Sequence, residues 1–232
     1  MDPTKKAARI VGLLFLVQMT MAVISHSVIL SPILYSENFL VDVSAHSTKV
    51  IVAMLFDLVT SASVFGIAVI LFPILKKHSE RIALWYVGLR LNEWVTSTIS
   101  GIFLLTILAI SKEYVLADAP ESAYLLTLGK YLLKARGSTQ TLALLGFCMS
   151  ASLFYYLLFT SRLLPRFISI WGLVGVLLLF SEILSNIFGH SLGGIIVMLP
   201  MGLNEIFLGI WLIVKGFNLS AANPNTLKTQ ID

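Results

Sequence analysis

Charged residues are scarce in this sequence. They make up 12% of its 232 residues, whereas hydrophobic residues make up 57%. Soluble domains carry about 25% charged and about 45–50% apolar residues, so these charges are too few to cover a water-facing surface. The excess apolar residues must face lipid, which predicts an integral membrane protein. The net charge of +4 does not indicate nucleic acid, because the basic residues stand mostly between apolar stretches, where membrane topology explains them.

The sequence also lacks the common signatures of chemistry. Its single cysteine, Cys148, excludes an intrachain disulfide and a multi-cysteine metal site within one chain. It contains no HExxH zinc motif, no GxSxG nucleophile motif and no glycine-rich phosphate loop. We therefore predict no metal and no cofactor, and the lack of an evident nucleophile argues against an enzyme.

Long apolar segments are what the sequence has in abundance. A spanning helix needs about 20 predominantly apolar residues, and each candidate is too long for a strand and lacks regular alternation. Backbone groups in hydrocarbon must also satisfy their own hydrogen bonds, which favours helix. The predicted fold is all-α, a polytopic membrane helix bundle with six transmembrane helices at about Ile10–Leu30, Val50–Leu75, Ile82–Ile110, Ser138–Thr160, Phe167–Phe188 and Leu192–Val214.

These segments leave no room for a separate soluble domain. We predict a single transmembrane bundle over residues 1–217 and a disordered tail over residues 218–232, which shows no apolar periodicity. The lipid bilayer is the predicted partner, and no oligomeric state follows from the sequence.

The longest connection contains a predicted amphipathic helix, Glu121–Arg136, in front of the fourth span. Asp118 is placed to cap it and Pro120 suits its first turn. Two arrangements stay open: the helix lies on the membrane surface, or it continues directly into the fourth span. Its polar and apolar faces carry, respectively, Thr127, Lys130 and Lys134, and Tyr124, Leu125, Leu128, Tyr131 and Leu132.

The distribution of lysine and arginine predicts the orientation. If the N-terminus is cytoplasmic, the inner side holds ten of these residues and the outer side five. The positive-inside rule then predicts a multi-pass protein of the cell membrane with both termini in the cytoplasm. The inner set is Lys5, Lys6, Arg9, Lys76, Lys77, Arg81, Arg162, Arg166, Lys215 and Lys228, and the outer set is Lys49, Lys112, Lys130, Lys134 and Arg136.

Charged residues inside the spans predict a candidate site. Ionisable groups at membrane depth are costly unless they are paired or hydrated. Arg90 and Glu93 are three residues apart and share a helix face, and helical rise places both, with Glu205, roughly 12–16 Å from the inner ends. Because a guanidinium can serve two carboxylates, we predict a network of these three residues, extended by Gln18, Asn92 and Asn204.

A second polar layer is predicted near the outer ends of the spans. His26, Asp57 and Glu182 lie within roughly 7–10 Å of those ends by helical rise. One imidazole and two carboxylates are metal-ligand types, but no two of them have a tight ligand spacing. A vestibule open to water is therefore favoured over a metal site.

Three functions fit these observations. The first is a small transporter-like or ligand-binding bundle that holds a small molecule or lipid around Arg90, Glu93 and Glu205, and Pro200, which precedes Glu205, could kink the sixth span there. The second is a membrane enzyme for a lipid or other apolar substrate, with a carboxylate as general base. The third is a structural or sensory protein whose charges only fix helix register.

Three sequence features resemble a known family. The first is Arg90-Leu91-Asn92-Glu93, and the second is the basic turn Ser161-Arg162-Leu163-Leu164-Pro165-Arg166 followed by Trp171-Gly172. The third is the closing segment Asn204-Glu205-Ile206-Phe207-Leu208-Gly209-Ile210-Trp211-Leu212-Ile213-Val214-Lys215-Gly216. Over about residues 8–217 the chain resembles the prokaryotic membrane proteins of domain-of-unknown-function family 4386. That resemblance implies a multi-helix membrane protein but no activity, substrate or cofactor.

Overall fold

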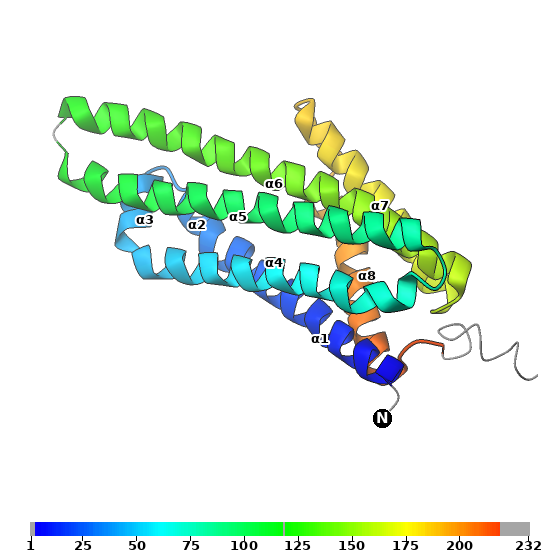
Figure 1. Ribbon diagram of the computed structural model, residues 1–232. Helices are drawn as coiled ribbons and strands as arrows, with labels where there is room; N and C mark the ends of the chain where they lie inside the picture. The colour runs from blue at the N-terminus through cyan, green and yellow to red at the C-terminus, as the bar shows by residue number, and fades with distance from the viewer. Residues whose placement is uncertain (1–2, 118, 219–232) are drawn as a thin grey trace, which may run out of the picture. The chain divides into compact units, whose positions relative to one another are not determined.

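The computed structural model describes residues 3–117 and 119–218, and within these the regular structure is entirely helical (Figure 1). The predicted all-α fold is confirmed. The elements are α1 (Pro3–Val23), the π-helix η1 (Ile24–Leu30), α2 (Ser31–Leu34), α3 (Phe39–Ala45), α4 (Ser47–Leu75), α5 (Glu80–Leu116), α6 (Ala119–Ser161), α7 (Arg166–Ile187) and α8 (Ile195–Val214).

Six helical segments of the described chain are long and apolar enough to cross a membrane. They confirm the predicted polytopic bundle, and each overlaps one predicted span. The structure extends several of them: the first continues through η1 and α2 to Leu34, and the third reaches Leu116. The six segments are Pro3–Leu34, Ser47–Leu75, Glu80–Leu116, Glu121–Ser161, Arg166–Ile187 and Ile195–Val214.

The predicted amphipathic segment Glu121–Arg136 is helical, and it continues without a break into the fourth span as α6. Leu125, Leu128 and Leu132 pack into a protein core, so protein covers much of the apolar face that was assigned to the membrane surface. The 43 residues of α6 span about 65 Å, which exceeds the thickness of a bilayer. Asp118, the predicted cap, lies outside the described residues, as does most of the predicted tail.

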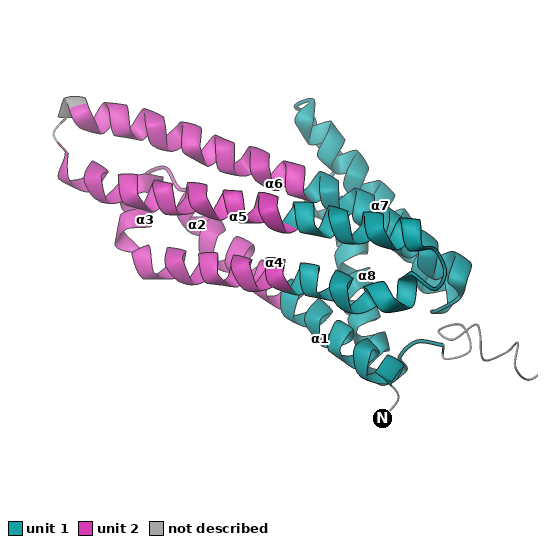
Figure 2. Ribbon diagram, viewed as in Figure 1, with its two compact units in different colours: residues 1–19, 63–93, 144–232 teal, residues 20–62, 94–143 magenta. Residues whose placement is uncertain are grey.

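The chain forms two compact units, and helices α1, α4, α5 and α6 each contribute to both (Figure 2). Unit 1 contains residues 1–19, 63–93 and 144–232, and unit 2 contains residues 20–62 and 94–143. The single bundle predicted over residues 1–217 stays a prediction.

Unit 1 is held together by close helix packing. A Cβ atom on Gly12 of α1 would lie 2.5 Å from the backbone oxygen of Gly209 in α8, and one on Gly175 of α7 would lie 3.0 Å from the Cα atom of Met201. Small residues at these positions let the helix backbones approach each other, as in many membrane proteins. Helix α8 continues through Pro200 without interruption, so Glu205 stands on a continuous helix.

Unit 2 has its own core, to which Leu30, Leu40, Val50 and Leu104 contribute. The π-helix η1 is its most unusual element, and it ends just before Pro32. Proline has no backbone N–H, and its ring crowds the carbonyl four residues earlier. The wider turn of η1 before Pro32 relieves this crowding in the helical hydrogen-bond pattern. Single π turns in α-helices are frequent at functional sites.

Candidate functional site

Arg90 is the centre of a buried polar cluster in unit 1. Its side chain is 3% exposed, and the guanidinium carbon lies 5.4 Å from the ring centroid of Tyr86 and 5.0 Å from that of Phe147. Tyr86 stands four residues before Arg90 on α5, so helical spacing alone places the two side chains together. Contact with two aromatic rings stabilises the cation where water is scarce.

Arg90 forms an ion pair with Glu93. Nη1 of Arg90 donates to Oε2 of Glu93 at 3.0 Å across one helical turn, as the spacing of the two residues predicts. The carboxylate of Glu93 is 15% exposed. Bonds from a guanidinium to a carboxylate are among the stronger hydrogen bonds of proteins, so this pair offsets part of the cost of burying both charges.

Glu205 of α8 joins the cluster through space. It is 5% exposed and interacts electrostatically with both Arg90 and Glu93. Within residues 3–117 and 119–218, however, its carboxylate accepts no hydrogen bond, and the short carboxylate bond of Arg90 is to Glu93. The predicted network of Arg90, Glu93 and Glu205 stays a prediction: Glu205 interacts electrostatically with Arg90 without a direct bond to it.

Two tyrosines complete this cluster, and sequence reasoning did not include them. The hydroxyls of Tyr86 and Tyr155 are buried, and neither has a hydrogen-bond partner among the described residues. Both interact electrostatically with Arg90 and Glu205. Tyr86 could have been found from its spacing to Arg90, whereas Tyr155 comes from α6 and only the packing of unit 1 brings it here.

The three predicted extensions of the network behave differently. Asn204 is buried and its Nδ2 donates to the backbone oxygen of Ile168 at 3.1 Å, so it links α8 to α7. Asn92 is exposed, and its amide nitrogen lies 3.3 Å from where a Cβ atom on Gly146 would stand. Gln18 is buried in α1. Asn204 thus contacts the backbone of α7 and not Arg90.

A second polar cluster forms in unit 2 around Asp57. Its Oδ1 accepts from Ser25 Oγ at 2.6 Å and lies 3.4 Å from Nε2 of His26, while its Oδ2 lies 3.5 Å from Nη2 of Arg136. Gln140 closes a ring, because its Oε1 accepts from Arg136 Nη1 at 3.4 Å and its Nε2 lies 3.5 Å from His26 Nδ1. His26 and Asp57, predicted as members of one polar layer, therefore meet.

Arg136 is the residue that sequence reasoning misplaced. It was counted among the loop residues of the outer side, but its side chain is 3% exposed and pairs with Asp57. Its position near the start of a predicted span concealed this role, since snorkelling basic residues are common there. The unbroken course of α6 carries Arg136 into the core of unit 2.

Glu182, the third member of the predicted outer layer, belongs to unit 1 and serves its own loop. Its carboxylate accepts from the side chains of Asn186 and Ser191 at 2.9 Å and from the backbone N–H groups of Leu192 and Gly194 at 3.0 and 3.1 Å. These donors occupy the carboxylate fully, so Glu182 organises the α7–α8 connection. In the described chain, no group of three or more His, Cys, Asp or Glu side chains is arranged to hold a metal ion.

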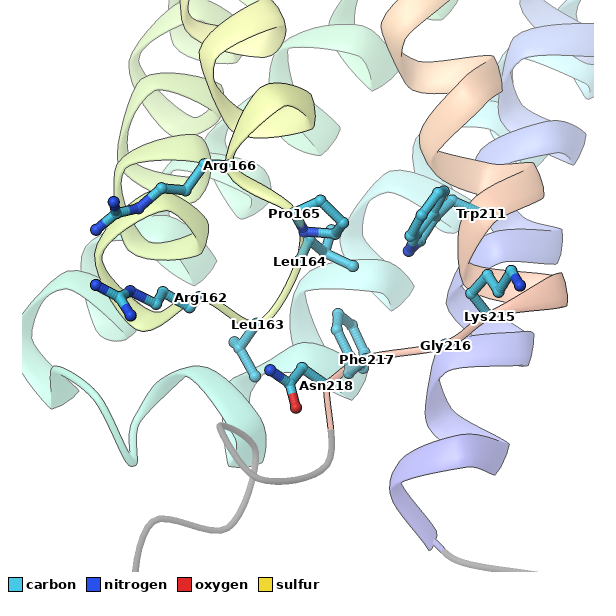
Figure 3. A pocket seen from close by; sticks show the side chains of 10 residues that line it. All are labelled: Arg162, Leu163, Leu164, Pro165, Arg166, Trp211, Lys215, Gly216, Phe217 and Asn218. Carbon is cyan, nitrogen blue, oxygen red and sulfur yellow. The ribbon is translucent and has the colours of Figure 1, made fainter.

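A groove in unit 1 lies beside the basic turn between α6 and α7, with a volume of about 510 Å³. Figure 3 shows the side chains of Arg162 and Arg166 on one side of this turn, pointing away from Trp211 and Lys215. The guanidinium of Arg166 lies over the ring of Phe159 at 5.1 Å. The three cations do not converge on one point, which is typical of residues that anchor helices at a membrane surface.

The residues of the Arg-x-x-Glu pair, the basic turn and the α8 segment all lie within one family match. The profile of a domain of unknown function, DUF4386, matches residues 10–216. The chain belongs to the DUF4386 family. No curated protein and no solved structure matches it.

Membership of DUF4386 supplies no activity, because the family is defined as one of unknown function. For this DUF4386 member, what can be said of chemistry rests on the geometry of the two polar clusters. One of them, around Arg90, is enclosed by aromatic rings, and the other, around Asp57, borders a cavity.

Proposed function

We propose that this protein is a small transporter-like or ligand-binding membrane bundle whose polar centre is the Arg90 cluster of unit 1. The ligand that the cluster accommodates is a proton or a small cation. Charge balance carries this proposal: two carboxylates, the partly buried Glu93 and the buried Glu205, surround the single guanidinium of Arg90.

An unbalanced charge at membrane depth costs several kcal/mol unless it is paired or hydrated. The Arg90–Glu93 ion pair is neutral as a unit, so an ionised Glu205 leaves the cluster with one negative charge in excess. A proton on Glu205 or a cation beside it removes this excess. Both tyrosine hydroxyls of the cluster carry free lone pairs, and with a carboxylate they form the all-oxygen ligand set that hard cations prefer.

Ion movement in liposomes tests the proposal. Purified protein is reconstituted, a potential negative inside is imposed, and entry of protons, radioactive sodium and radioactive rubidium is recorded. We expect at least one of these ions to enter faster than into protein-free liposomes. Because Glu205 provides the excess charge, Glu205→Gln should return that rate to the level of empty liposomes, and Arg90→Leu should do the same.

The matched control is Glu113→Gln, which makes the same chemical change at an exposed carboxylate of α5. This variant should keep the wild-type rate. Wild-type protein that moves none of the three ions, or Glu205→Gln protein that moves them at the wild-type rate, would contradict the proposal. Full ion movement in the Glu205→Gln variant would favour a cluster that only fixes helix register.

We also propose that both termini face the cytoplasm. Gly216, after α8, packs against Ala8 of α1, where a Cβ atom would lie 3.7 Å from the Ala8 side chain, so the two ends of unit 1 share one side. Since Arg136 is buried in unit 2, the outer side holds four lysines against ten basic residues inside, which strengthens the positive-inside argument.

Cysteine labelling of intact cells tests this orientation in a Cys148→Ala background. An impermeant thiol reagent should label Lys49→Cys, which stands at an exposed position in the first turn of α4, and should spare Lys77→Cys, which follows the end of α4. The opposite labelling pattern would show that the termini face outward.

A further inference from the structure

The polar ring around Asp57 borders a cavity that the proposed function does not use. The cavity has a volume of about 250 Å³ and lies within unit 2, and all its lining residues come from η1, α2, α6 and the adjoining Tyr35. Its polar lining consists of His26, Ser27, Ser31, Tyr35, Arg136 and Gln140. Ligand pockets for drug-sized molecules are about 300–1,000 Å³, so this cavity suits a small ligand of a few heavy atoms.

The lining is rich in donors and carries one positive charge. Arg136, the amide of Gln140 and three hydroxyls can all donate, and none of the described lining residues is acidic. Asp57 lies behind the lining, where it contacts Arg136 and His26. An anion therefore finds donors on several sides, whereas a cation finds no carboxylate in the wall.

Arg136 is loosely held for a buried arginine. Its contacts to Asp57 and Gln140 are 3.5 and 3.4 Å long, compared with about 2.7–2.9 Å for a well-formed bond from a guanidinium to a carboxylate. Nε and Nη2 donate no hydrogen bond to any residue in the described part of the chain. A buried donor without an acceptor costs about 1–3 kcal/mol, and an anionic ligand that draws the guanidinium toward the cavity supplies the missing acceptor.

The surrounding ring suits one tautomer of His26. With its proton on Nε2, His26 points this N–H toward Asp57, and Nδ1 faces the amide of Gln140 as an acceptor. The wide turn of η1 carries His26, Ser27 and Leu30 to the cavity, and α2 follows with Ser31 and Leu34. The π-helix thus presents polar and apolar groups of one segment to the same space.

From this arrangement we propose that the cavity of unit 2 binds a small organic carboxylate. The guanidinium of Arg136 can hold a carboxylate in a planar, two-point geometry. Because Asp57 already pairs with this guanidinium, a singly charged carboxylate adds less excess negative charge than a phosphate dianion. Leu30 and Leu34 provide an apolar wall for a short aliphatic tail. This site is separate from the Arg90 cluster, because all its residues belong to unit 2.

Binding in detergent solution tests the site with four probes: propionate, butyrate, inorganic phosphate and methylammonium. Calorimetry of the full-length protein should show saturable binding of the two carboxylates and none of methylammonium. Arg136→Lys keeps the charge but loses the planar fork, so butyrate should bind about tenfold or more weakly. Lys134→Gln, which removes an exposed charge from the same helix, should leave the affinity within about twofold.

A second variant keeps the test decisive if Arg136→Lys does not fold. Ser27 is exposed at the edge of the cavity, and Ser27→Phe fills that space without altering the ring around Asp57. This variant should bind no butyrate. Three results would each overturn the proposal. They are no binding of carboxylates to the wild type, wild-type affinity for butyrate in both Arg136→Lys and Ser27→Phe, and a preference of the wild type for phosphate or methylammonium.

Discussion

The two units solve the same problem, a buried arginine, in different ways. In unit 1 the guanidinium of Arg90 lies between aromatic rings and forms a short ion pair with Glu93. In unit 2 the guanidinium of Arg136 makes only long contacts and borders a cavity. The difference indicates that packing and ion pairing hold the Arg90 guanidinium, whereas the Arg136 guanidinium keeps N–H groups that no acceptor occupies.

The difference extends to the carboxylates. Glu205 has no hydrogen-bond donor in the described chain, while Asp57 contacts Ser25, His26 and Arg136. Low dielectric makes an unpaired charge expensive and a paired one strong. The Arg90 cluster of unit 1 therefore requires a further positive charge, whereas the Asp57–Arg136 pair of unit 2 is already neutral before a ligand binds.

The largest expected effect is that of Arg90→Leu. Removal of the guanidinium leaves the partly buried Glu93 and the buried Glu205 without a cation, and breaking a buried pair in this way costs about 3–5 kcal/mol. Unfolding of the purified protein in mixed detergent micelles measures the loss. Arg81→Leu, at an exposed position of the same helix, should stay within about 0.5 kcal/mol of wild type. Equal stability of the two variants would show that Arg90 is not paired.

The next largest effect is a difference in stability between variants of two carboxylates of unit 1. Glu182→Gln loses a charged acceptor with four bonded donors, and hydrogen bonds to charged groups contribute about 1.5–3 kcal/mol. Glu205→Gln removes a charge that has no bonded donor, so it should cost less or increase stability. The same unfolding assay compares the two variants. A larger loss of stability for Glu205→Gln would contradict the conclusion that the Glu205 carboxylate is unpaired.

Helix packing at two glycines, one in each unit, should differ as well. Gly12→Ala in unit 1 brings a methyl group against the Gly209 backbone oxygen of α8, and overpacking of this kind costs about 1–3 kcal/mol. Gly137→Ala, next to Arg136, finds no atom within 4 Å and should gain up to about 1 kcal/mol from helix propensity. Unfolding midpoints measure both, and destabilisation by Gly137→Ala as large as that by Gly12→Ala would refute the difference in packing.

The smallest expected loss is that of Arg136→Leu. Because its bonds are long and it borders a cavity, removing it should cost about 1 kcal/mol, well below the loss for Arg90→Leu. Unfolding experiments on Arg90→Leu and Arg136→Leu give the two losses of stability to be compared. A loss at Arg136 that equals the loss at Arg90 would show that the two arginines are equally tightly held.

Sequence reasoning reached most of the fold because its signal is strong. Six apolar segments of sufficient length predict six spanning helices, and the structure contains them. The i, i+3 spacing likewise predicted that Arg90 and Glu93 would pair. These features depend on residues close together in the chain, so local periodicity is enough to find them.

Features that depend on distant segments were missed or misplaced. Tyr155 reaches the Arg90 cluster from α6, and Arg136 reaches Asp57 of α4. Helical rise gives the depth of each residue but not the direction in which its side chain points. For the same reason the sequence groups Glu182 with His26, although donors of the α7–α8 connection occupy the Glu182 carboxylate.

Infrared spectroscopy of the reconstituted protein tests the central claim most directly. In a buffer whose only cation is too large to enter the cluster, the missing positive charge of the Arg90 cluster must be a proton. The account predicts an absorption band of a protonated carboxyl group at neutral pH that is absent from Glu205→Gln and retained by Glu113→Gln. The account would be contradicted if the wild type lacked this band, or if the band persisted in Glu205→Gln.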